Sequence, residues 1–171
     1  VYKKYMVTYS NGDGGSYEKE FKYGEVITIP TNEFFKDTFR KTGHTIKEWQ
    51  GYTEGMTMPL KDLTFTAVYV PCEYTVTFED NGGEEINPIA VTFGEKYGSL
   101  PSSAITGLSG GNKNWYLVDA DGNVTETNIK KLTLVSTARD HKLFIKRNVL
   151  APSVSVALTV PGGISDGYQY Y

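Results

Sequence analysis

A glycine-rich stretch at residues 107–111 carries the pattern of a hydrolase nucleophile. It reads Gly-Leu-Ser-Gly-Gly, which matches G-x-S-x-G, and Asp140 and His141 follow in the order that a serine hydrolase uses. Such a nucleophile needs a buried strand before the serine and a helix after it. Residues 102–106 (Ser-Ser-Ala-Ile-Thr) and 112–114 (Asn-Lys-Asn) are typical of neither element. We therefore predict a glycine loop without a catalytic residue, in a protein that is not an enzyme.

A second candidate for chemistry is an acidic segment that begins at Asp119 and continues through Asp121. Its start resembles a calcium loop of the EF-hand type, which requires glycine at the sixth position and a bidentate glutamate at the twelfth. Those positions hold Val124 and Lys130, and the glycine comes early, at Gly122. An Asp-Gly pair between valines is typical of a hairpin turn. We predict a turn here, with weak calcium binding as the alternative.

Metal-binding and redox chemistry have few residues to draw on. The chain has two histidines, His44 and His141, which lie in different halves, and the single cysteine is Cys72. A zinc site needs several His or Cys ligands at short spacing, and a disulfide needs a second cysteine. The sequence therefore predicts no metal, no cofactor and no internal disulfide, with each histidine at a strand edge.

The tyrosine-rich end of the chain is the candidate for ligand binding. Tyr168, Tyr170 and Tyr171 are close together, and exposed tyrosine offers contact area at a low entropic cost. A glycan or an extracellular host protein is the partner that such a platform would take. An unpaired strand edge is a second route to a peptide partner. The competing interpretation is that the tyrosines simply line the faces of sheets.

Charge and hydropathy exclude two classes of partner. The formal net charge is −3, so the chain lacks the basic field that nucleic-acid binding requires. No run of about 18 apolar residues is present, so we predict no insertion into a membrane. We expect the protein to be monomeric within a longer multidomain chain.

The elements that must position these residues occur twice along the chain. Alternating strands, glycine turns and a tryptophan recur in the same order, and internal repetition of this kind indicates tandem modules. The matched landmarks are residues 5–9 with 74–78, Gly12 with Gly82, residues 23–25 with 93–95, Gly43 with Gly107, and Trp49 with Trp115. We predict a repeat over residues 1–71, a divergent repeat over 72–147, and a segment over 148–171 that starts a further β module or docks as strands.

Each unit is predicted to begin with a hairpin, continue through a short helix and end with further strands. Gly43 ends a stretch with helical spacing in which Phe34, Phe35 and Phe39 share an apolar face. We expect these rings to form the core with Trp49 and Trp115, which pack between helix and sheet. Turns are predicted at Gly12, Gly24, Gly43, Gly82, Gly94 and Gly122. The fold class is α+β and strand-dominated, with two tandem β-grasp-like repeats and a C-terminal β segment.

The same landmarks carry a family resemblance. Residues 74–78 (Tyr-Thr-Val-Thr-Phe), 81–83 (Asn-Gly-Gly), 93–95 (Phe-Gly-Glu) and 100–101 (Leu-Pro) resemble the Listeria–Bacteroides repeat, also called the internalin B-repeat. The first unit resembles it through residues 7–9, 23–25, 42–45 and Trp49. The family usually has Thr-Gly-Tyr-x-Phe-x-Gly-Trp, whereas this chain has His44 at the aromatic place and Glu48 before the tryptophan.

The resemblance covers roughly residues 3–147 and departs furthest in the second unit, where Leu108 takes the aromatic place. It implies β-grasp-like repeats of secreted bacterial cell-surface proteins, which act as stalks or adhesion modules. The family offers no catalytic residue to carry over. The resemblance therefore implies an extracellular, non-catalytic spacer, with a carbohydrate- or protein-binding module as the alternative.

Overall fold

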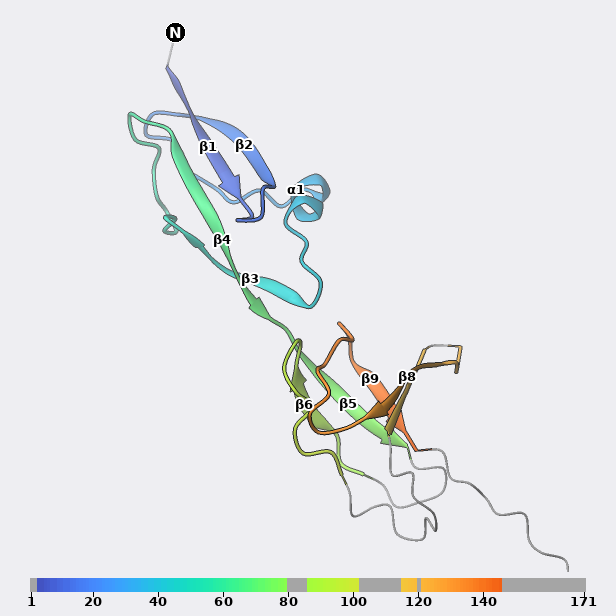
Figure 1. Cartoon of the computed structure of the whole chain (residues 1–171). Helices are drawn as coiled ribbons and strands as arrows, with labels where there is room; N and C mark the ends of the chain where they lie inside the picture. Colours follow the sequence, from blue (N-terminus) through green and yellow to red (C-terminus); the bar gives the residue numbers. More distant parts are fainter. Residues whose placement is uncertain (1–2, 80–85, 102–114, 120, 146–171) are drawn as a thin grey trace, which may run out of the picture.

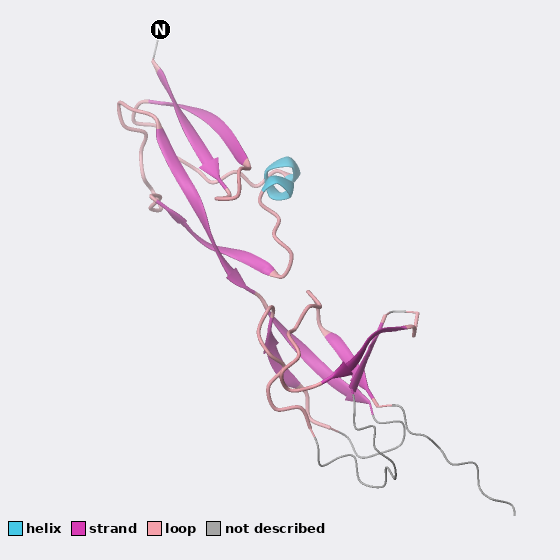
Figure 2. Cartoon of the chain, viewed as in Figure 1, coloured by secondary structure: helices cyan, strands magenta, loops and turns pink. Residues whose placement is uncertain are grey.

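The computed structural model describes residues 3–79, 86–101, 115–119 and 121–145. It contains two sheets that follow one another along the chain, with the first in blue to green and the second in green to orange (Figure 1). Strands dominate the described residues, and α1 (Glu33–Thr38) is the one helix among them (Figure 2). We call residues 3–71 repeat 1 and residues 73–145 repeat 2.

Repeat 1 is a four-stranded mixed sheet with the order β2-β1-β4-β3. Strands β1 (Lys4–Ser10) and β2 (Ser16–Lys22) form an antiparallel hairpin, and β4 (Leu63–Pro71) lies parallel to β1. Strand β3 (His44–Gln50) pairs antiparallel with β4 and forms one edge, with an irregularity between Ile46 and Glu48. The hairpin turn is closed by the side chain of Asn11, whose Oδ1 accepts the N–H groups of Asp13 and Gly15 at 2.8 Å.

The helix of repeat 1 is short and capped by Asn32. The Oδ1 atom of Asn32 accepts the N–H of Phe35 at 2.7 Å, which satisfies one of the unpaired donors of the first turn. Phe35 is buried on the core side, and Phe39, at the C-cap, is buried as well. The prediction that Phe34 belongs to the core is wrong, because its side chain is 70% exposed. Neighbouring residues of a helix point in different directions, so in this six-residue helix Phe35 faces the core and Phe34 does not.

The core of repeat 1 is built around aromatic rings. Tyr9 is fully buried and lies 5.7–5.8 Å, centroid to centroid, from the rings of Phe35, Trp49 and Phe65. The rings meet at steep angles, the edge-to-face arrangement that aromatic pairs favour. The Tyr9 hydroxyl donates to the carbonyl of Thr28 at 2.8 Å, so its polar end is satisfied. Trp49 is partly buried and packs against this cluster.

Repeat 2 is a five-stranded mixed sheet with the order β6-β5-β9-β7-β8. Its elements, in chain order, are β5 (Glu73–Glu79), β6 (Ile89–Thr92), β7 (Trp115–Val118), β8 (Val124–Ile129) and β9 (His141–Phe144). As in repeat 1, the first and last strands lie parallel in the middle of the sheet, with β5 beside β9. The core includes Trp115, which is 2% exposed and lies 4.9 Å from the ring of Phe78.

The register makes the two repeats comparable residue by residue. Val7 is opposite Leu63 in repeat 1, and Val76 is opposite His141 in repeat 2. The turns after β2 and β6 are tied to a later loop by matching backbone bonds, from Gly24 N to Met58 O and from Gly94 N to Val135 O. An aspartate before the closing strand accepts a backbone N–H in each: Asp62 from Met6, and Asp140 from Thr75, both at 2.8 Å.

Several predictions can be located on this frame. Gly12, Gly24, Gly43, Gly94 and Gly122 all have positive φ, as the predicted turns require. Pro71 is the last residue of β4. Gly82, the segment at residues 102–111, and the end of the chain from 148 to 171 lie outside the described residues.

Candidate functional site

The junction between the two repeats consists of a single residue, Cys72, between β4 and β5. Its backbone is bonded on both sides. The N–H of Cys72 donates to the carbonyl of Gly43 at 2.8 Å, and its carbonyl accepts the N–H of Phe93 at 3.0 Å. One partner belongs to repeat 1 and the other to repeat 2. The backbone pairing therefore continues through the junction, which leaves the connecting residue little freedom to swing.

Side chains close around the same point. Gly43 is buried and has φ +67°, and a Cβ atom at this position would overlap the ring of Phe93. Glycine is required here for both conformation and space. The imidazole of His44 meets the Phe93 ring edge-on, with 5.7 Å between centroids. Phe93 of repeat 2 thus packs against the Gly43–His44 loop of repeat 1.

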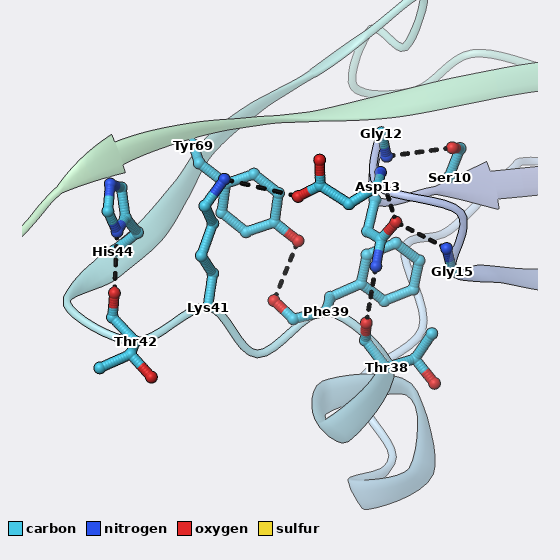
Figure 3. Close-up of polar contacts among 11 residues, drawn as sticks. Ser10, Gly12, Asp13, Gly15, Thr38, Phe39, Lys41, Thr42, His44 and Tyr69 are labelled. Carbon is cyan, nitrogen blue, oxygen red and sulfur yellow. Dashed lines mark hydrogen bonds and ion pairs between the residues drawn. The ribbon is translucent and has the colours of Figure 1, made fainter.

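The segment that leads into that loop is bonded to other parts of repeat 1 (Figure 3). The hydroxyl of Tyr69 donates to the Phe39 carbonyl at 3.0 Å, and the amide of Asn11 donates to the Thr38 carbonyl at 3.2 Å. Lys41 lies 5.2 Å above the ring of Tyr69, a distance typical of a cation–π contact. Burial raises the pKa of the Tyr69 phenol, so the hydroxyl stays a donor to a higher pH than that of a free phenol. These contacts tie residues 38–41, which lead into the Gly43–His44 loop, to the rest of repeat 1.

Two further contacts shape the tip of the loop. Lys41 forms an ion pair with Asp13 at 3.5 Å, and the Nδ1 atom of His44 lies 2.8 Å from the Thr42 carbonyl (Figure 3). The backbone N–H of His44 also donates to the carbonyl of Lys41 at 3.0 Å. The exposed ion pair contributes little by itself. The histidine contacts orient the imidazole toward the junction.

The sequence predicted a turn at Gly43 and a boundary between residues 71 and 72, but it did not predict this contact. Two signals were available in the sequence. One was the loop glycine Gly43 in the first unit, and the other was the aromatic residue Phe93 in the second unit, at the position that Tyr23 holds in the first. Nothing in the local sequence indicates that the two meet, because they are 50 residues apart and belong to different repeats.

The second group of polar residues is a buried pair in repeat 2. The hydroxyl of Tyr97 lies 2.8 Å from Nε2 of His141, and Nδ1 of His141 lies 2.8 Å from the Arg139 carbonyl. A carbonyl only accepts, so Nδ1 donates to Arg139, and Nε2 shares a hydrogen bond with the Tyr97 hydroxyl. Burial raises the pKa of Tyr97 to about 12. Both imidazole nitrogens are engaged, so this pair is structural.

His141 corrects the prediction that each histidine lies at a strand edge. It begins β9, which lies between β5 and β7, and it is 8% exposed. In repeat 1 the matching positions are Ile27 and Leu63, both apolar. Repeat 2 therefore has a hydrogen-bonded pair where repeat 1 has two apolar residues.

The acidic candidates Asp119 and Asp140 accept hydrogen bonds from backbone N–H groups. Oδ1 of Asp119 accepts the N–H groups of Asp121 and Asn123 at 3.0 and 2.8 Å, and Gly122 donates back to the Asp119 carbonyl. The prediction of a turn is confirmed. The hydrogen bonds from Asn123 hold the pKa of the Asp119 carboxyl below its usual value. Asp140 is bonded to the backbone of Thr75, and the Ser of the G-x-S-x-G stretch lies outside the described residues.

Within the described ranges, no three His, Cys, Asp or Glu side chains are grouped so that they could hold a metal ion. No helix in the part of the chain that the structure describes is long and apolar enough to span a membrane.

The predicted ligand platform at Tyr168, Tyr170 and Tyr171 falls outside the described residues. Two aromatic side chains of repeat 1 are strongly exposed, Tyr23 at 63% and Phe34 at 70%. The edges of the first sheet are poor templates for an added strand. Strand β2 carries alternating charges in the sequence Ser-Tyr-Glu-Lys-Glu-Phe-Lys, and β3 has an irregular register, and both features discourage edge pairing.

Comparison with known proteins gives one family. The family model described as Flg_new: Listeria-Bacteroides repeat domain (List_Bact_rpt) matches residues 5–68 and 74–144. No curated protein matches the chain. Among solved structures, one described as "Crystal structure of Mub-RV" is 12% identical, with a TM-score of 0.28, over 83% of this chain and 98% of that chain.

Proposed function

Since the chain belongs to the Listeria-Bacteroides repeat family, as two tandem copies, we propose that it is a non-catalytic spacer of an extracellular, cell-surface bacterial protein. The family is found in bacterial surface proteins and is generally non-catalytic. The proposed mechanism is geometric. Each repeat is a compact unit, and the junction between units limits bending, so an array of them would extend outward. In repeat arrays each unit contacts only its neighbours, and these interfaces add to the stability of the whole array.

The observation that carries this proposal is that the backbone of Cys72 forms hydrogen bonds with both repeats. A flexible linker of several residues would let two modules tumble separately, as interdomain linkers usually do. Here a single residue joins the sheets and exchanges backbone hydrogen bonds with Gly43 and Phe93. The packing of Phe93 on the Gly43–His44 loop adds a second restraint that resists rotation about the junction.

We further propose that each repeat follows the β-grasp plan. Repeat 1 supports this with its hairpin, its short helix and a last strand parallel to the first. Repeat 2 supports it with the parallel pairing of β5 and β9. In this plan the two central strands belong to the ends of the unit, so that tension applied at the termini is carried by adjacent, mutually bonded strands.

The spacer proposal is tested by pulsed electron–electron double resonance, which measures the distance between one spin label on each repeat. Exposed Glu54 and Lys131 are suitable positions once Cys72 is replaced by Ser, because serine keeps the backbone bonds of that residue and a side chain that can hydrogen-bond to Tyr74 as the thiol does. We expect a narrow distance distribution in the parent chain. Phe93→Ala should broaden it, whereas Phe34→Ala, which removes an exposed ring of the same type, should not. A broad distribution in the parent chain would contradict the proposal.

A further inference from the structure

The exposed ring of Tyr23 occupies a defined position in the repeat. It follows β2 directly, at the start of a turn in which Gly24 has φ +79°. The turn is fixed by bonds from Glu25 N to the Lys22 carbonyl at 3.0 Å and from Gly24 N to the Met58 carbonyl at 2.9 Å. A 63% exposed aromatic ring is therefore presented by a rigid turn.

The strand register identifies Phe93 as the counterpart of Tyr23 in repeat 2. Lys4 pairs with Lys22 at the end of the first hairpin, and Glu73 pairs with Thr92 at the end of the second. Tyr23 and Phe93 are the next residues after Lys22 and Thr92. The turns that follow have the same backbone bonds, since Glu95 N donates to the Thr92 carbonyl at 3.1 Å and Gly94 N to Val135 O at 2.8 Å.

The two counterparts differ in what covers them. Phe93 is half-buried because the Gly43–His44 loop of the preceding repeat lies on it. Tyr23 belongs to repeat 1, and its ring stays 63% exposed among the described residues. We propose that the Tyr23 turn is a docking surface for the glycine–histidine loop of a further repeat placed on the N-terminal side of repeat 1. This inference rests on the proposed spacer function, since it extends the same junction by one unit.

The geometry of the known junction defines the occupant. The loop must present a glycine in the left-handed conformation, because any side chain at Gly43 would overlap the ring it covers. An imidazole or another flat ring after the glycine would meet the Tyr23 edge as His44 meets Phe93. Lys3 stands where Cys72 stands in the second repeat, directly before the first paired residue of the hairpin. Its backbone would supply the bonds that Cys72 supplies.

The hydroxyl group distinguishes Tyr23 from Phe93. The Phe93 ring lies edge-on to His44, and an added hydroxyl at the end of such a ring remains free to reach water or a polar rim. Tyrosine therefore fits a surface that is solvated before the partner repeat is present. Phe34, although equally exposed, has its ring 6.4 Å from that of Tyr17 and belongs to the helix, so it provides a matched control.

The test extends the full chain by one repeat. Residues 3–72 are duplicated and placed before residue 4, so that the copy's loop faces the original Tyr23, and all original residues from 4 to 171 are kept. With spin labels on the copy and on repeat 1, we expect a narrow distance peak like that of the natural junction. Tyr23→Ala in the original repeat should abolish the narrow peak, Tyr23→Phe should retain it, and Phe34→Ala should retain it. Gly43→Ala in the copy should abolish it.

A second measurement follows Tyr23 directly. With the copy's own Tyr23 replaced by Phe, nitration of the original Tyr23 by tetranitromethane, mapped by mass spectrometry, should fall relative to the unextended chain. A broad peak at the new junction beside a narrow one at the natural junction overturns this inference alone. Broad peaks at both junctions overturn the spacer function as well. A narrow peak that survives Tyr23→Ala, or unchanged nitration, also overturns the assignment of Tyr23.

Discussion

Repeat 1 and repeat 2 share a backbone frame but fill it differently. In both, the first and last strands are parallel neighbours, a glycine turn is tied to a later loop, and an aspartate accepts a backbone N–H from the first strand. Repeat 1 packs aromatic rings around Tyr9, whereas repeat 2 contains the hydrogen-bonded pair of Tyr97 and His141. The comparison teaches that backbone bonding, rather than core composition, is what these two copies have in common.

The different cores should respond differently to substitution. An aromatic cluster depends on packing area, and its loss is costly because large cavities cannot collapse. A buried polar pair depends on mutual satisfaction, so removing one member costs more than removing both. The two repeats therefore offer two kinds of test within one chain.

The largest effect is expected at the centre of the aromatic cluster. Tyr9→Ala should reduce the free energy of unfolding by about 3–5 kcal/mol, the usual cost of deleting a fully buried large side chain. Its counterpart Phe78 is only half-buried, so Phe78→Ala should cost less. Hydrogen exchange measured strand by strand should show lost protection in β1, β2 and β4 for Tyr9→Ala.

Tyr9→Phe is the matched control, since it keeps the ring and removes only the bond to the Thr28 carbonyl. It should cost about 1 kcal/mol. Equal costs for Tyr9→Ala and Phe78→Ala would show that the aromatic cluster does not distinguish repeat 1.

The second prediction exchanges the polar pair of repeat 2 for the apolar pair of repeat 1. His141→Leu leaves the Tyr97 hydroxyl buried without its partner and should destabilise the chain by up to about 3 kcal/mol. The double variant Tyr97→Ile with His141→Leu reproduces Ile27 and Leu63 and should recover most of that loss. Urea unfolding followed by circular dichroism measures both. Additive losses in the double variant would mean that the pair is not a unit.

How much of this could be predicted from sequence depends on the range of the interaction. Alternation and glycine turns predicted the strands and the positive φ of Gly24 and Gly94, because these are local properties. The family resemblance predicted two tandem copies, and the family model matches both. The burial of His141 was missed, since a histidine after Asp140 resembles a surface residue until the closing strand is placed in the centre of the sheet.

The junction could not be predicted for a related reason. The contact of Gly43 with Phe93 depends on the direction in which β4 continues into β5, which is a property of two assembled sheets. Phe34 failed as a core residue because helical spacing gives a face, and a six-residue helix buries only part of it. Periodicity predicts which residues share a side, and tertiary packing decides how many of them are covered.

Alkaline pH provides a third way to separate the cores. Burial raises the pKa of Tyr97 from its ordinary value of about 10 to about 12, so the unfolded chain ionises first as the pH rises. The contribution of the protonated Tyr97 phenol to the free energy of unfolding is complete below about pH 10. It is lost between about pH 10 and 12, by about 2 kcal/mol at pH 12. Burial raises the pKa of Tyr9 as well, so the parent chain should weaken in both repeats.

Tyr97→Phe isolates the contribution of repeat 2. The free energy of unfolding, measured in urea from pH 8 to 12, should fall less steeply in this variant than in the parent. Identical slopes for the two proteins would show that Tyr97 ionises as easily in the folded chain as in the unfolded one.

The smallest effect should be equal in the two repeats, because it concerns the shared frame. Asp62→Ala removes the acceptor for Met6 N, and Asp140→Ala removes the acceptor for Thr75 N. Each site is exposed, so water replaces the carboxylate and each change should cost about 1 kcal/mol. The Asp→Asn variants keep an acceptor oxygen in place and should cost less. Thermal unfolding of the four variants measures these costs. Similar shifts of the unfolding temperature at both positions would support a common backbone frame. A shift confined to one repeat would mean that the aspartate matters only for the packing of that repeat.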